Sequence, residues 1–229
     1  ISARDHGAAT IVVEENFDIG GHAMLSGGRV QLGGGNALQK KFGIDDSPDK
    51  VFEDWTTFKR GDARYNDRDL VRTFADECVP TFQFLLENGV TFIEEPIVTP
   101  DAATVPRVFV THEWHIPSEV IAPRRNRNGS GLVRRLAESA RAKGARILLK
   151  HEMTKIVRDG GIGSQGLGRV LGIVARADGK DIAIEARKGV VIATGGHTGN
   201  VNFRRMFDPR LTEEYQQAGL PYSLQGADG

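Results

Sequence analysis

The sequence predicts a mixed α/β domain in which helices and strands pack in layers. Two runs rich in β-branched residues, "TIVVE" at 10–14 and "GVVIATGG" at 189–196, lack apolar–polar alternation. Such runs are typical of strands buried on both faces of a parallel sheet. Helical patterns and shorter strand patterns lie between them, and this order along the chain indicates an α/β fold.

Two helices are predicted in the first quarter of the chain. "ISARDHGA" reads as the last turn of a helix that ends at Gly7. Farther on, Ser47 is a typical N-cap and Pro48 a typical first helical residue, and the pattern predicts a helix that ends at Gly61. Its apolar face is formed by residues at helical spacing, namely Val51, Phe52, Trp55 and Phe58.

Two more helices and a group of strands follow. "DRDLVRTFADECVPTFQFLLENG" predicts a helix that is kinked or broken near Pro80. "GSGLVRRLAESARAKG" predicts another that ends at Gly144. Short strands are expected in "RILLK", "MTKIVRD", "RVLGIVARA" and "DIAIEA". The alternating pair over 169–186 predicts an antiparallel β-meander with a turn at Asp178-Gly179.

The composition excludes several classes of protein. The 229 residues include 30 basic and 30 acidic side chains, and this balance gives no electrostatic footprint for nucleic acid or an anionic membrane surface. No apolar run approaches the roughly eighteen residues that a spanning helix needs. A single cysteine allows no internal disulfide. We therefore expect a cytoplasmic protein with no membrane span and no nucleic-acid partner.

Glycine is concentrated where strands are expected to end. Seven glycines fall within residues 20–35, and "ATGG" at 193–196 follows the second buried run. Backbone without a Cβ can approach a pyrophosphate or a flat ring closely. Glu14, at the end of the first run, suits the two hydroxyls of an adenosine ribose. An exposed acid and a set of tight turns are the alternatives, but the combination favours an extended dinucleotide such as FAD along the sheet edge.

These segments resemble a known family. The acidic strand end followed by Gly-Gly and then Ser-Gly-Gly, the run "GVVIATGGHTGN" and the final "GADG" occur in the same order in one flavoprotein family. It is the family of fumarate reductases, succinate dehydrogenase flavoprotein subunits and 3-ketosteroid Δ1-dehydrogenases. "GSGLVRRLAESARAKGARILLKHEMTKIV" is similar to the helix and strand that separate these motifs in the family, so the resemblance covers essentially the whole chain.

The resemblance implies a Rossmann-like FAD-binding domain with a mixed sheet, a β-meander and a helical insertion. Residues 1–229 would form part of this domain, with a mostly helical insertion at about 45–127. The family's Gly-x-Gly-x-x-Gly turn would precede Ile1. Its substrate-capping domain and catalytic acid/base residues would follow residue 229, so no catalytic residue can be named.

The resemblance also implies roles for individual residues. Glu14 would bind the adenosine ribose, the Ser-Gly-Gly segment would lie against the pyrophosphate or the flavin ring, and Asp228 would reach the ribityl or flavin side. The adenine would rest near Met153 to Lys155. The complete set of expected FAD-binding residues is Glu14, Glu15, Gly20, Gly21, His22, Ser26, Gly27, Gly28, Met153, Thr154, Ala193, Thr194, Gly195, Gly196, Asn200 and Asp228.

Other residues invite different interpretations. His22 lies where some family members attach flavin covalently, but its spacing to Ser-Gly-Gly matches the non-covalent members. The histidines of "HEWH", His112 and His115, are three apart rather than four, so a metal site is not expected, and either could contact substrate. The basic run at 124–128 is expected to be a solvated loop, and Cys78 a core residue.

The leading functional hypothesis is an FAD-dependent oxidoreductase that moves hydride between flavin and an activated C–C bond. The substrate would be a small molecule of the dicarboxylate, enone or ketosteroid-like class. NAD(P)H or an electron-donor or acceptor protein would be the redox partner. Two alternatives are a non-catalytic FAD- or nucleotide-binding fragment and an NAD-binding domain. The Ser-Gly-Gly segment after Glu14 favours a flavin-binding domain over an NAD-binding domain.

Overall fold

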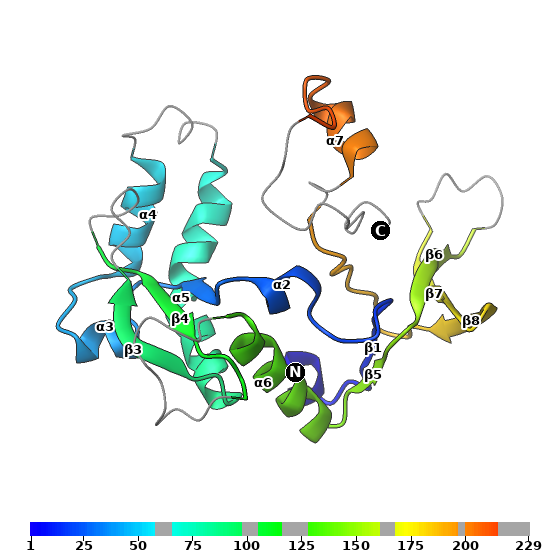
Figure 1. Ribbon diagram of the computed structural model, residues 1–229, viewed down its shortest axis with the longest axis horizontal. Coiled ribbons are helices and arrows are strands. Elements are labelled where there is room, and N and C mark those ends of the chain that lie inside the picture. Colours follow the sequence, from blue (N-terminus) through cyan, green and yellow to red (C-terminus); the bar gives the residue numbers. More distant parts are fainter. Residues whose placement is uncertain (58–65, 98–104, 116–127, 161–167, 197–199, 215–229) are drawn as a thin grey trace. The chain divides into compact units, whose positions relative to one another are not determined.

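The computed structural model describes residues 1–57, 66–97, 105–115, 128–160, 168–196 and 200–214 (Figure 1). Its contacts divide the chain into two compact units. The first unit comprises Ile1–Thr10 and Ile19–Ala145, and the second comprises Ile11–Asp18 and Arg146–Gly229. Helices and strands occur together with parallel and antiparallel pairing, so the predicted α/β class is confirmed. Each unit is described by itself below.

The first unit holds six helices among its described residues. They are α1 (Ser2–Asp5), α2 (Gly21–Leu25), α3 (Ala37–Lys41), α4 (Pro48–Thr56), α5 (Arg68–Glu87) and α6 (Ser130–Ala142). Three predicted boundaries are confirmed by local geometry. The Ser47 side chain accepts a hydrogen bond from the Lys50 amide, and Gly7 and Gly144 adopt the left-handed conformation just after their helices. The predicted end of α4 at Gly61 is wrong, because the helix ends at Thr56 and Thr57 is already extended. Phe58 lies outside the described residues.

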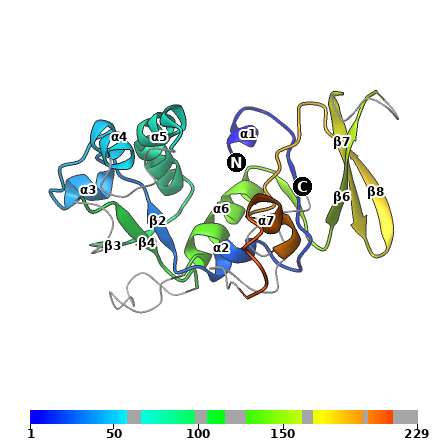
Figure 2. The same cartoon turned by 90° about the horizontal axis from the view of Figure 1, so that it is seen from above.

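Helix α5 is continuous through Pro80, so a break there is excluded, whereas the alternative of a kink stays a prediction. Its buried side chains recur every three or four residues, at Val71, Ala75, Cys78, Phe82 and Leu85. This apolar stripe is packed into the core of the first unit, and α4 lies against α5 in both views (Figures 1 and 2). Burial along the whole length stabilises the helix sufficiently to offset the hydrogen bond that a proline removes.

A three-stranded antiparallel sheet completes the first unit, and the sequence patterns did not predict it. Strand β4 (Val108–Thr111) lies between β2 (Arg29–Gln31) and β3 (Phe92–Ile97). Phe82 of α5 stacks on Phe92 with ring centroids 4.8 Å apart and meets Phe109 edge-on at 5.6 Å. All four residues of β4 are buried, because the strand is covered by α5 on the core side and flanked on both edges.

The second unit contains a short parallel sheet. Strand β1 (Ile11–Val13) pairs in parallel with β5 (Arg146–Leu148), so the predicted parallel strand exists. Its predicted burial on both faces is wrong, since Ile11 and Val12 are 39% and 43% exposed. Among the described residues β1 pairs with one strand only, and a two-stranded sheet covers little of its own surface.

The predicted β-meander is confirmed in the second unit. Strands β6 (Glu152–Arg158), β7 (Val170–Ala177) and β8 (Lys180–Glu185) are antiparallel neighbours in chain order. Asp178 and Gly179 both have positive φ, 49° and 73°, as a tight two-residue hairpin requires. The turn residues thus fix the register of β7 against β8.

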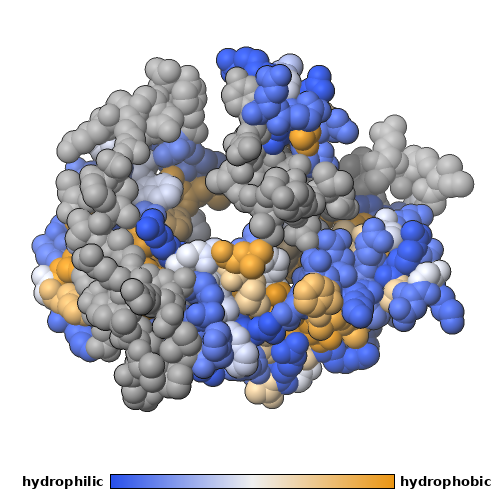
Figure 3. Space-filling view, viewed as in Figure 1, coloured by the Kyte–Doolittle hydropathy of each residue, from blue (hydrophilic) through white to orange (hydrophobic). Residues whose placement is uncertain are grey.

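The second apolar run does not form the strand that was predicted. Residues 189–196 have no ladder partner among the described residues, and Val191 and Ile192 are 90% and 53% exposed. Without a neighbouring strand the β-branched residues have nothing to pack against. Helix α7 (Val201–Phe207) follows. Apolar side chains of this kind appear as isolated patches on the otherwise largely hydrophilic face in Figure 3.

Candidate cofactor site

Glu14 lies at the carboxyl end of the parallel β1–β5 pair. Its backbone is held on both sides, because its amide donates to the Leu148 carbonyl and its carbonyl accepts from the His151 amide, each at 2.9 Å. The carboxyl ends of parallel strands are where ligands bind in α/β sheets. The predicted ribose-binding residue therefore occupies a suitable and rigidly anchored position within the second unit.

The Glu14 carboxylate is also fixed by one neighbour. The backbone amide of Asn16 donates to Glu14 Oε1 at 2.9 Å, and the Asn16 side-chain amide donates to the same oxygen at 3.1 Å. The other oxygen, Oε2, has no partner in the described part of the chain. Glu15, the next predicted residue, is exposed. Glu14 thus offers an oriented carboxylate oxygen that is available to a hydroxyl donor.

The expected adenine contacts lie on β6. Met153 is half-buried beside a register irregularity between Met153 and Lys155, and the Thr154 hydroxyl donates to the Val174 carbonyl at 3.3 Å. Lys150, which lies in the connection between β5 and β6, has a φ of 57°, and this value is unusual for a residue other than glycine. Its amide donates to the Asn16 carbonyl, so the turn after β5 is tied to the turn after β1.

The segment Ala193–Gly196 leaves its glycines uncrowded. A Cβ on Gly195 or Gly196 would meet no atom of the described residues within 4 Å, although Gly195 has a φ of 91°. Asn200 caps α7, because its side chain accepts from the Phe203 amide at 2.9 Å. The assignment of Asn200, Ala193 and Thr194 to the cofactor site stays a prediction. Asp228 lies outside the described residues.

Two of the predicted glycines in the first unit are required by the protein's own packing. A Cβ on Gly20 would lie 2.6 Å from Val133 Cγ1, and one on Gly28 would lie 2.5 Å from the Asn128 carbonyl oxygen. Gly20, Gly21 and Gly28 also have positive φ. Helix α2, which begins at Gly21, consequently packs closely on α6 (Figure 2). These positions need glycine whether or not a cofactor is bound.

Gly27 behaves differently from its neighbours. A Cβ there would meet nothing within 4 Å, so the surrounding protein does not require glycine at this position. The adjacent Ser26 hydroxyl donates to the Ala23 carbonyl at 2.9 Å and accepts from the Gly28 amide at 3.2 Å, which shapes the loop around Gly27. On α2, the buried Nε2 of His22 has no hydrogen-bond partner among the described residues.

The triple-glycine turn at 33–35 does not present its amides to a ligand, contrary to what the sequence indicated. The Gly34 amide donates to Asp46 Oδ2 at 2.8 Å, and the amides of Gly35 and Asn36 donate to the Gln39 side-chain oxygen at 2.9 and 3.1 Å. These three amides are used within the protein.

A buried ion pair holds this turn, and sequence patterns did not reveal it. Arg107, whose side chain is 2% exposed, donates to both oxygens of the fully buried Asp46 at 2.8 and 2.9 Å, and also contacts Asp54 at 2.5 Å. Burial raises the pKa of the Asp46 carboxyl, but hydrogen bonds from Arg107, Gln39 and Gly34 outweigh it, so the pKa lies below the usual 3.8. Burial is also the main reason that the pKa of the Cys78 thiol is raised.

Neither histidine of "HEWH" forms part of a metal site in the described structure. His112 is buried at the end of β4, where desolvation lowers its pKa, while a hydrogen bond with the Phe92 backbone opposes that shift. His115 lies 3.9 Å from the Glu113 carboxylate. The described residues contain no group of three or more His, Cys, Asp or Glu arranged for a metal ion. Contact of either histidine with substrate stays a prediction.

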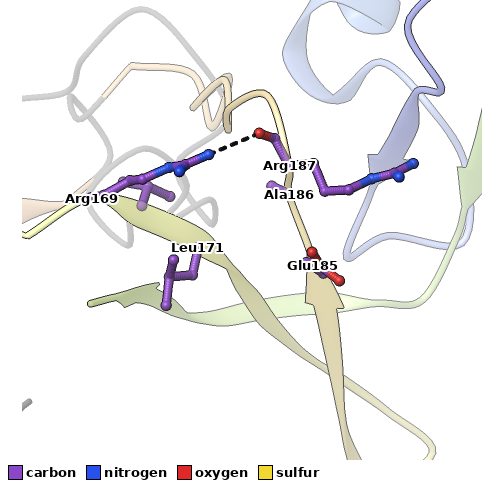
Figure 4. Close-up of a pocket in the computed structure, with 6 residues that line it drawn as sticks. Arg169, Leu171, Glu185, Ala186 and Arg187 are labelled. Atoms are coloured by element: carbon purple, nitrogen blue, oxygen red, sulfur yellow. Dashed lines mark hydrogen bonds between the residues drawn. The ribbon is translucent and has the colours of Figure 1, made fainter. Parts of the chain in front are cut away.

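A cavity of about 320 Å³ lies elsewhere, where β7 begins and β8 ends (Figure 4). Its lining comprises Arg169, Val170, Leu171, Glu185, Ala186 and Arg187. Arg169 donates to the Arg187 carbonyl at 3.2 Å, and the Arg187 side chain points away from the cavity. None of the predicted cofactor residues lines it.

Comparison with known proteins identifies the family. The sequence pattern of the FAD binding domain family matches residues 1–222. The chain belongs to this FAD binding domain family. Its cofactor is accordingly FAD, and the oriented Glu14 carboxylate and the uncrowded Gly27, Gly195 and Gly196 each suit an adenosine ribose or a closely approaching cofactor.

The relatives are flavin-dependent oxidoreductases. The chain is 27% identical over 219 residues to urocanate reductase from Eggerthella lenta, covering 93% of the chain and 32% of that protein. It is 28% identical over 231 residues to the acrylate reductase flavoprotein subunit of Shewanella woodyi, covering 96% and 41%. Fumarate reductases are among the further matches. The resemblance inferred from the sequence motifs is confirmed.

The fold also matches a solved enzyme structure. The 3-ketosteroid-Δ4-(5α)-dehydrogenase from Rhodococcus jostii, in complex with 4-androstene-3,17-dione, superposes with a TM-score of 0.76 at 28% identity. The match covers 96% of this chain and 47% of that one. The chain therefore spans about a third to a half of the length of the urocanate reductase, the acrylate reductase subunit and this dehydrogenase. None of the helices in its described part has the length and hydrophobicity that a bilayer crossing demands.

Proposed function

We propose that the intact protein is an FAD-dependent oxidoreductase that transfers hydride between flavin and an activated C–C bond of a small organic substrate. The observation that carries this proposal is the match of residues 1–222 to the FAD binding domain family, with Glu14 held at the carboxyl end of β1. In such enzymes the flavin supplies the hydride chemistry, and the protein supplies binding and orientation.

The residues of this chain would bind and place the cofactor. Glu14 Oε2 would accept a hydrogen bond from an adenosine ribose hydroxyl, and the uncrowded glycines would allow backbone to approach the pyrophosphate or the ring. The Rossmann-like arrangement and the helical insertion at about 45–127 belong to the same proposal. So do the remaining sequence-predicted contacts.

The substrate class follows from the relatives. They are named for urocanate, acrylate and 3-ketosteroids, and a dicarboxylate, enone or ketosteroid-like molecule would be handled by the same cofactor chemistry. The electron partner would be NAD(P)H or an electron-transfer protein. We assign no catalytic acid or base to residues 1–229.

The test begins with the purified intact protein. We expect it to bind FAD, to show flavin absorbance and to be bleached by a chemical reductant. Glu14→Ala should weaken FAD binding by about 10- to 100-fold, because hydrogen bonds to charged groups contribute about 1.5–3 kcal/mol. Glu185→Ala, on the edge strand β8, is the matched control and should leave binding unchanged.

The outcomes separate the alternatives. A protein that stays colourless with added FAD contradicts the proposal. Bound flavin that is neither reoxidised by urocanate-, acrylate-, dicarboxylate- or enone-type acceptors nor reduced by their saturated counterparts favours a non-catalytic flavin-binding role instead.

A further inference from the structure

We infer that Asn16 is a positioning residue for the cofactor's ribose, acting only through Glu14; this inference rests on the proposed function. The two Asn16 donors converge on a single oxygen, Glu14 Oε1, at 2.9 and 3.1 Å. One donor comes from the backbone and the other from the side chain. Together they fix both the rotamer of Glu14 and the plane of its carboxylate.

The surrounding backbone makes this arrangement rigid. The Asn16 carbonyl accepts from the Lys150 amide at 2.9 Å, and the Glu14 carbonyl accepts from His151 at 2.9 Å. Lys150 is held in a left-handed conformation, with φ at 57°, to make the first of these bonds. A strained non-glycine residue at the carboxyl edge of a sheet is the kind of feature that a functional site retains. The hydrogen bond from the Lys150 amide holds the Asn16 turn in place.

The consequence is an asymmetric carboxylate. Oε1 is occupied by protein donors, whereas Oε2 has no partner in the described part of the chain. A glutamate side chain that is already ordered loses little rotamer freedom when a ligand binds. Its free oxygen is therefore directed toward the ribose hydroxyls before the cofactor arrives. Asn16 makes no contribution to a flavin that lacks the adenosine part.

The experiment is a double-mutant cycle on FAD affinity in the intact protein. Asn16→Ala removes the side-chain donor but keeps the backbone one, so we expect affinity for FAD to fall by about 5-fold. Asn16→Asp should be worse than Asn16→Ala, because it sets a second carboxylate against Glu14. Asn16→Ser, which keeps a short donor, should recover part of the loss. Combined with Glu14→Ala, the Asn16→Ala change should have no further effect.

A merely structural role predicts different results. FMN and riboflavin lack adenosine, so their affinity should be the same in the Asn16→Ala and unaltered proteins, and a loss shared by all three flavins overturns the inference. Additive effects of the Asn16 and Glu14 substitutions also overturn it. If the unaltered protein binds FAD but Asn16→Ala binds it equally well, only this inference fails. If the unaltered protein binds no FAD, the proposed function fails as well.

Discussion

Two glycine-rich segments of this protein use the same residue for opposite purposes. In the turn at 33–35 of the first unit, protein acceptors take the amides of Gly34 and Gly35, and a Cβ on Gly33 would lie 2.4 Å from the Arg107 side chain. In the segment Ala193–Gly196 of the second unit, a Cβ on Gly195 or Gly196 would meet no described residue within 4 Å. Glycine in the first segment makes room for a buried ion pair, whereas in the second no described residue of the chain requires it. Clustered glycines therefore do not identify a cofactor site until their neighbours are known.

The largest effect is expected from breaking the ion pair that the 33–35 turn surrounds. Arg107→Leu would leave Asp46 buried without its main partner and should lower the free energy of unfolding by about 3–5 kcal/mol. Chemical denaturation measures this loss. The control is Arg72→Leu, which removes an exposed ion pair with Asp76 and should change the denaturation midpoint far less. Equal losses in the two variants would show that the Arg107 network has no special structural role.

A pH titration tests the same network. The pKa of Asp46 is lower in the folded protein than its ordinary 3.8, so its contribution to stability is present above that value and is lost as the pH falls through the folded-state pKa. Unfolding free energies measured from about pH 6 down to about pH 3 should therefore decline more steeply for the unaltered protein than for Asp46→Asn. Parallel curves would contradict the lowered pKa.

The third prediction addresses the turn itself. Gly33→Ala forces a Cβ into the space that Arg107 and Asp46 occupy, and overpacking of this kind should cost about 1–3 kcal/mol of stability. The folded Gly33→Ala protein should bind FAD with unchanged affinity, so any loss of binding should reflect only a smaller folded fraction. The change is measured by thermal or chemical unfolding with and without FAD. A stable Gly33→Ala protein would mean that the turn can move away from the ion pair.

The smallest effect on stability is expected from the matched substitution Gly196→Ala. Neither Gly33 nor Gly196 has a positive φ, so the comparison isolates the space around each residue from backbone strain. Stability of the apoprotein should stay within about 0.5 kcal/mol, as for other substitutions away from packed features. FAD affinity should fall because the added methyl group stands where backbone meets the cofactor. Unchanged affinity would remove Gly196 from the proposed site.

Local features were predictable where one segment holds all of the information. The cap at Ser47, the helix ends at Gly7 and Gly144 and the hairpin turn at Asp178-Gly179 depend on a few adjacent residues, and each is confirmed. Pro80 does not break α5, because burial of the α5 stripe outweighs the local penalty. The sheet formed by β2, β4 and β3 was missed, since its strands are short and β2 pairs with β4 from about eighty residues away.

The candidate site was predictable to a similar extent. Glu14 was identified from its place after an apolar run, and the structure sets it at the end of a parallel strand. The sequence did not indicate that Asn16 holds one of its carboxylate oxygens, because a polar residue in a loop has many possible partners. Nor did the sequence show that protein contacts crowd the glycines at 33–35, whereas no described residue crowds Gly195 or Gly196.

By itself, the sequence determined the α/β class, the positions of most helices and turns, and the FAD-binding family, because these depend on residue type and short-range spacing. Only the tertiary structure decided which glycines serve the protein's own packing. It also decided that Arg107 pairs with Asp46 across 61 positions and that residues 189–196 have no strand partner among the described residues. The physical reason is that steric room and desolvation are properties of the atoms surrounding a residue, and those atoms come from distant parts of the chain.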